Sequence, residues 1–132
     1  MNELNVSSFE KALISLDSII IRYKNDNYDV DIRDAVIQRF EYTYSLAVKM
    51  MTRFINLQSA EAKNTMTFNE IIRTANQFGL LKGDLSVWDE FRQKRNMTFH
   101  TYDENIANQV VAVIPNFKEE AEFLLERLKK RI

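Results

Sequence analysis

The chain has no cysteine, only two glycines, one proline and one histidine among its 132 residues. The absence of cysteine excludes disulfide bonds, thiolate metal sites and a cysteine nucleophile. A single histidine makes a histidine-rich metal centre implausible within one chain, so we expect no metal and no cofactor. The scarcity of glycine and proline argues against a turn-rich β fold and favours long helices.

The chain has no excess of charge of either sign, because its 18 basic residues are balanced by 19 acidic residues and the formal net charge is −1. Any nucleic acid would therefore have to be bound by a local basic patch. The N-terminus has no basic stretch followed by an apolar run, and no apolar segment is long enough to span a bilayer. We expect a cytoplasmic chain with no membrane partner, folded as a single domain over residues 1–132.

The apolar residues recur at intervals of three and four, which is the spacing of one face of a helix. This pattern predicts long helices over residues 7–24, 31–57 and 103–131, a short helix after Thr67, and a fourth long helix after Asp84. Residues 58–65 contain no large apolar side chain and are expected to form a connection. The elements predict an all-α, antiparallel up-and-down four-helix bundle with one extra short helix. Pro115 is expected to kink or break the last helix.

Several helix ends carry capping signals. Thr67 and Glu70 have the spacing of a capping box, in which each side chain accepts from the other residue's backbone N–H. Gly79 suits the position just after a helix, where a left-handed backbone is common. Asp84 can cap the next helix, whose Trp88 side chain is expected to face the core.

The only histidine, His100, follows Arg95 by five residues in the polar segment RQKRNMTFHTYDEN, residues 92–105. On an ideal helix this spacing would place the two side chains about 140° apart, too far for one site in one subunit. A helix break between them is therefore required if they act together. Asp103, or a capping box formed by Thr101 with Glu104, can start a new helix after such a break.

We accordingly predict that one helix ends near Asn96 or Met97, that a tight corner follows, and that the last helix begins near Asp103. At that corner Arg95 and His100 can converge beside a helix N-terminus, which favours an anion. The alternative is purely structural: both side chains cap a helix end and pair with Asp103 or with the glutamate that follows it.

Histidine, arginine and a helix N-terminus together suit phosphate chemistry. A histidine near its unperturbed pKa exchanges protons at cellular pH, and an arginine offers a fixed, charged fork for a phosphate. In RNA, attack of a 2′-hydroxyl on its own 3′-phosphate needs a proton acceptor, a donor to the leaving oxygen, and charge stabilisation at phosphorus. No metal is required in principle.

Three segments resemble a known family. RNMTFHTYDE (residues 95–104) resembles the R-N-x-x-x-H-x-Y signature of HEPN-domain proteins of the HepT type, also described as nucleotidyltransferase substrate-binding proteins. RFEYTYSLAVKMM (residues 39–51) and IIRTANQFGLLKGDLSVWDEFRQKRN (residues 71–96) resemble two further family segments, in the same order and with comparable gaps. The chain departs from the family pattern at Ser45, Val48 and Phe99, and none of these changes touches the signature.

The resemblance implies a helical bundle that forms a homodimer, with two such motifs lining one cleft that binds RNA. Because the motif is intact, it implies a metal-independent endoribonuclease toxin that leaves a 2′,3′-cyclic phosphate. His100 is then the acid and base, Arg95 the phosphate clamp and Asn96 a polar positioner. The cognate MNT-type nucleotidyltransferase is the antitoxin, and in some pairs it adds AMP to the tyrosine that corresponds to Tyr102.

Two interpretations of the sequence remain open. The chain is either a ribonuclease toxin or a non-catalytic substrate-binding or partner subunit of a small nucleotidyltransferase. Glu41, Tyr42 and Tyr44 either contribute to the cleft or serve as ordinary packing and surface residues.

Overall fold

The protein is all-helical throughout the part of the chain that the computed structural model describes, residues 4–58 and 65–132. No strand occurs within these residues, as the sequence predicted. The helices are α1 (Ser7–Asn25), α2 (Val30–Gln58), α3 (Phe68–Gln77), α4 (Leu85–Asn96), the short 3₁₀ helix η1 (Thr98–His100) and α5 (Glu104–Arg131). Most of the predicted connection over residues 58–65 lies outside the described residues.

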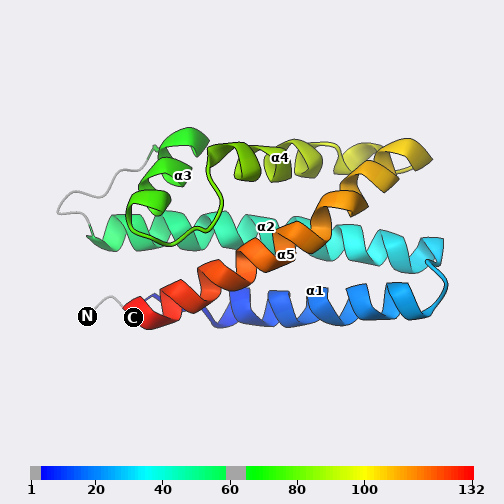
Figure 1. The fold of residues 1–132 in the computed structure, drawn as a ribbon, viewed down its shortest axis with the longest axis horizontal. Coiled ribbons are helices and arrows are strands. Elements are labelled where there is room, and N and C mark those ends of the chain that lie inside the picture. The colour runs from blue at the N-terminus through cyan, green and yellow to red at the C-terminus, as the bar shows by residue number, and fades with distance from the viewer. Residues whose placement is uncertain (1–3, 59–64) are drawn as a thin grey trace.

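The four long helices alternate in direction along the molecule (Figure 1). Helices α1 and α2 form an antiparallel pair, α4 lies on the other side of α2, and α5 runs back obliquely across the bundle. The short α3 sits beside α2 before α4 begins. The predicted four-helix bundle with one extra short helix is therefore confirmed. No helix in the described ranges has the length and apolar character needed to cross a membrane.

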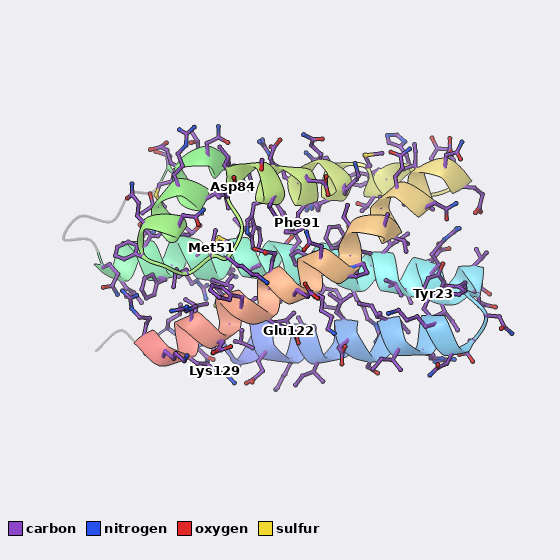
Figure 2. The ribbon with its side chains drawn as sticks, in the orientation of Figure 1. Tyr23, Met51, Asp84, Phe91, Glu122 and Lys129 are labelled. Carbon is purple, nitrogen blue, oxygen red and sulfur yellow. The ribbon has the colours of Figure 1, made fainter. Side chains whose placement is uncertain are left out.

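The core is built around Phe117 of α5, which is fully buried. Its ring centroid lies 5.0 Å from that of Phe40 in α2 and 5.3 Å from that of Phe91 in α4, both edge-to-face. Trp88 adds a further edge contact at 6.1 Å. Phe91 is seen between α4 and α5 in Figure 2. These contacts fix α4 against α2 and α5, so the position of the α4 C-terminus is set by the core.

The predicted capping signals form as expected. Thr67 and Glu70 make both hydrogen bonds of a capping box at the start of α3. Gly79 has a φ of 75° just after α3, the left-handed region that favours glycine. The Asp84 carboxylate accepts from the backbone N–H groups of Ser86 and Val87, which starts α4.

Of the kink or break expected at Pro115, the break does not occur, because α5 is continuous from Glu104 to Arg131. The proline side chain is exposed, and Val111, whose carbonyl loses its helical partner, is half-buried. The neighbouring Ile114 and Phe117 are buried and hold the helix on both sides. Packing therefore outweighs the local preference for a break.

Candidate active site at the corner between α4 and α5

The predicted helix break between Arg95 and His100 is present. Helix α4 ends at Asn96, and the following residues form three successive turns, each closed by a backbone hydrogen bond. The Met97 N–H donates to the Lys94 carbonyl at 3.1 Å, the His100 N–H to the Met97 carbonyl at 3.0 Å, and the Asp103 N–H to the His100 carbonyl at 3.0 Å. Because the α-helix is interrupted here, the 140° separation expected on an ideal helix no longer applies.

Asp103 starts α5, as one of the two predicted alternatives. Its Oδ1 accepts from the N–H groups of Asn105 at 2.9 Å and Ile106 at 3.4 Å. The capping box between Thr101 and Glu104 does not form. The Thr101 hydroxyl instead donates to the Thr98 carbonyl at 3.3 Å.

Glu104 is held by an arginine 71 residues away in the sequence. The guanidinium of Arg33, which is buried in α2, donates to Oε2 of Glu104 at 2.6 Å and to Oε1 at 3.4 Å. This hydrogen bond, together with the arginine charge, lowers the pKa of Glu104 and raises that of Arg33. The ion pair joins the first residue of α5 to the start of α2, at the end of the molecule where α1 turns into α2 (Figure 1).

His100 lies at the surface of this corner. Its Nδ1 is 3.2 Å from the hydroxyl of Tyr102, and the two rings meet edge-to-face with centroids 5.9 Å apart. The neighbouring aromatic side chains are also exposed, Phe99 by 79% and Tyr102 by 82%. The phenol engages Nδ1, and Nε2 of the imidazole has no hydrogen-bond partner among the described residues.

Arg95 is half-buried at the end of α4. Its Nε is buried without a hydrogen-bond partner, and no carboxylate among the described residues forms an ion pair with it. Burial raises the pKa of Tyr44 to about 12, while the nearby charges of Arg92 and Arg95 act in the opposite direction. The structural alternative, in which Arg95 pairs with Asp103 or the following glutamate, is therefore not what the structure contains.

The Arg95 side chain lines a shallow pocket of about 320 Å³ together with one face of α2. The α2 residues are Gln38, Glu41, Tyr42 and Ser45. Glu41 and Tyr42 thus lie beside Arg95, whereas Tyr44 is buried in the core. Sequence reasoning missed Gln38 and Ser45. Gln38 precedes Glu41 by three residues and Ser45 follows Tyr42 by three residues, so the helical repeat would have placed all four on one face.

The predicted site residues make few hydrogen bonds with one another. Arg95 and His100 share the corner, yet no hydrogen bond joins them in the described part of the chain. Asn96, the last residue of α4, is exposed and makes no side-chain hydrogen bond there. Among residues 4–58 and 65–132, no group of three His, Asp or Glu side chains is placed to hold a metal ion.

A family model and a named relative each match almost the whole chain. Residues 4–130 match the family model "Nucleotidyltransferase substrate binding protein like". A Haemophilus influenzae protein named "Probable ribonuclease HepT" is 35% identical over 140 residues, covering 98% of this chain and 95% of its own.

Two solved structures share the fold over almost their whole length. One, from Haemophilus influenzae, is described as the fold of a substrate binding domain of a nucleotidyltransferase. It has a TM-score of 0.87 and 33% identity, and the match covers 95% of this chain and 99% of that chain. A protein of Thermus thermophilus has a TM-score of 0.70 and 28% identity, with coverage of 91% and 98%.

Proposed function

The chain belongs to the nucleotidyltransferase substrate binding protein-like family, and from this premise we propose that it is a metal-independent endoribonuclease. In this proposal residues 1–132 form a single HEPN-type domain that acts in the cytoplasm as the toxin of a toxin–antitoxin pair. The antitoxin is a cognate MNT-type nucleotidyltransferase, in keeping with the family description. The name of the 35% identical Haemophilus influenzae protein supports the ribonuclease activity.

One observation carries the proposal: Arg95 has no carboxylate partner among the described residues and lies at the end of α4, just before the corner that exposes His100. A structural arginine at a helix end would be expected to pair with a carboxylate, and the sequence offers Asp103 and Glu104 as candidates. Asp103 is instead occupied with backbone N–H groups and Glu104 with Arg33. The guanidinium therefore keeps its capacity to bind an anion from outside the chain.

The proposed reaction uses these side chains in fixed roles. The 2′-oxygen of the ribose attacks the adjacent phosphorus and gives its proton to a histidine imidazole, while the 5′-oxygen leaves and receives a proton. The products are a 2′,3′-cyclic phosphate and a 5′-hydroxyl end. Arg95 stabilises the charge that develops on the phosphoryl oxygens, and Asn96 positions the phosphate. In a homodimer, the two copies of His100 can serve as base and acid.

The test measures cleavage of a single-stranded RNA by the purified chain. We expect His100→Ala and Arg95→Ala each to lower the rate by about 100-fold or more, the range of a general acid–base group. Both side chains are outside the core, so the helical content should be unchanged. The exposed Gln109→Ala variant, also polar and near the start of α5, is the matched control and should cleave normally.

Cleavage that survives in both variants, or that stops when a chelator is added, would contradict the proposal. The 2′,3′-cyclic phosphate end is identified by mass spectrometry of the fragments.

The second candidate is a non-catalytic substrate-binding or partner subunit of a nucleotidyltransferase. It is favoured by the exposure of Phe99 and Tyr102, which gives the corner the character of a docking surface. Expression of the chain without its partner separates the two candidates. Growth arrest that His100→Ala relieves indicates the ribonuclease, whereas normal growth with stable binding to the nucleotidyltransferase indicates the partner subunit.

A further inference from the structure

We propose that the pocket formed by Arg95 and the face of α2 that carries Gln38, Glu41, Tyr42 and Ser45 is a nucleobase subsite that prefers guanine. This α2–Arg95 pocket would hold the base of the nucleotide whose phosphate Arg95 binds. The inference rests on the proposed function, because it assumes that RNA reaches the corner. It adds a base preference that the Arg95 and His100 chemistry does not itself supply.

The arrangement of the pocket suits one nucleotide. The four α2 residues follow each other at intervals of three, one and three, so they share one face and span about two turns, or roughly 10 Å. Arg95 approaches this face from α4. A nucleotide likewise has an anionic phosphate at one end and a flat, hydrogen-bonding base at the other.

Tyr42 supplies a surface on which a base can stack. It is 40% exposed, and its hydroxyl lies 3.0 Å from the Ser15 hydroxyl on the neighbouring helix α1. This hydrogen bond ties the tip of the ring to α1 and limits its motion. Because the ring is already ordered, little further conformational entropy is lost when a base stacks on it, and the stacking is stronger.

Glu41 selects the base by its hydrogen bonds. A carboxylate only accepts, and the Watson–Crick edge of guanine presents two adjacent donors, N1–H and the N2 amino group. Adenine and cytosine each present one donor beside an acceptor, and uracil presents its one donor between two carbonyl oxygens, which repel a carboxylate. Glu41 forms no ion pair in the described part of the chain, so its carboxylate stays available.

The charges also set the orientation of the nucleotide. Glu41 repels a phosphate, and Arg95 attracts one, so the phosphate must lie at the α4 side of the pocket and the base over α2. This orientation places the phosphate at the C-terminal end of α4, the end that leads into the corner with His100. Gln38 and Ser45 can donate or accept at the edges of the base.

The experiment measures binding of the four nucleoside 3′-monophosphates, which have no leaving group and so can be used with the wild-type chain. We expect guanosine 3′-monophosphate to bind at least about 10-fold more tightly than the uridine compound, with adenosine and cytidine between. Glu41→Gln replaces two acceptors by one donor and one acceptor, a pair that an edge of each of the four bases can match. Its preference for guanine should therefore be lost. Glu119→Gln, an exposed glutamate of α5 outside the pocket, is the control.

A parallel map of cleavage sites on a mixed-sequence RNA separates the inference from the proposed function. Cleavage with equal binding of all four nucleotides, or a guanine preference that persists in Glu41→Gln, overturns the subsite and leaves the ribonuclease intact. A guanine preference that Glu41→Gln abolishes, without any cleavage, supports the subsite and overturns the ribonuclease. No cleavage and no nucleotide binding overturn both.

Discussion

Tyr102 combines two properties that a modification site needs. Its side chain is almost fully exposed, and its hydroxyl lies beside Nδ1 of His100. A tyrosine that merely packed its ring over the start of α5 would be covered, and this one is not. A group attached to the phenol would therefore displace the His100 contact and occupy the space in front of the corner.

We predict that the cognate nucleotidyltransferase adds AMP to Tyr102. The added phosphodiester would compete with the RNA phosphate for Arg95, so one modification would block the site while the bundle remained folded. Intact-mass measurement after co-expression should show an AMP-sized increase that is lost in Tyr102→Phe. Tyr28→Phe, at another exposed tyrosine, is the control and should leave the increase in place.

If the mass is unchanged while toxicity is still neutralised in a stable complex, the partner acts by covering the corner, and the modification hypothesis is wrong.

The elements meet at the corner through contacts that are distant in sequence. Helix α4 is placed by its aromatic core contacts, and α5 is anchored at its first residue by the ion pair between Arg33 and Glu104. The corner between them holds His100 and is short, so any movement of the α5 N-terminus changes where the imidazole lies. The ion pair is therefore a link between fold stability and the geometry of the site.

This link should make the α5 start sensitive to acid. The folded-state pKa of Glu104 lies below its ordinary value of 4.5, so its contribution to stability is present above pH 4.5. That contribution is lost as the pH falls below 4.5 and through the lowered pKa. We expect Glu104→Gln to have a lower free energy of unfolding than wild type at pH 7, and a shallower loss of stability on the acid side.

Urea unfolding followed by circular dichroism between pH 7 and pH 3 measures both effects. Glu126→Gln, which removes an exposed ion pair with Lys130 one turn away, is the matched control, because such pairs contribute little in water. Parallel acid curves for wild type and Glu104→Gln would show that the ion pair does not have this role.

At the scale of the whole molecule, one corner presents one arginine and one histidine, which is a small site for an RNA strand. Phe99 and Tyr102 are both exposed aromatic side chains at the same corner, the kind of residue that an interface covers. Association of two chains about this corner would bring two copies of Arg95 and His100 into one positive cleft.

We predict a homodimer whose two-fold axis passes close to residues 92–102. Light scattering at micromolar concentration should give twice the mass of 15.6 kDa. Because the chain has no cysteine, a single Gln93→Cys substitution gives one spin label per subunit, and the distance between the two labels should be short. Glu126→Cys, near the other end of the bundle, should give a long distance. A monomer, or the reverse order of distances, would contradict this arrangement.

Much of the fold could be predicted from the sequence because its causes are local. Apolar spacing of three and four residues gave the helices to within a residue or two, and the caps at Thr67, Gly79 and Asp84 involve only neighbouring backbone groups. The break between Arg95 and His100 followed from the same local chemistry, since Asp103 must start a new helix after it.

The tertiary structure alone decided which polar groups meet. The capping box at Thr101 failed because Arg33, 71 residues away, engages Glu104, and Pro115 did not break α5 because buried neighbours hold it. The partners of Arg95 on α2 could not be read from spacing along α4, because they depend on how two helices pack. Local signals fix where a helix begins and ends, whereas contacts between helices depend on the summed packing of the core, which no single segment contains.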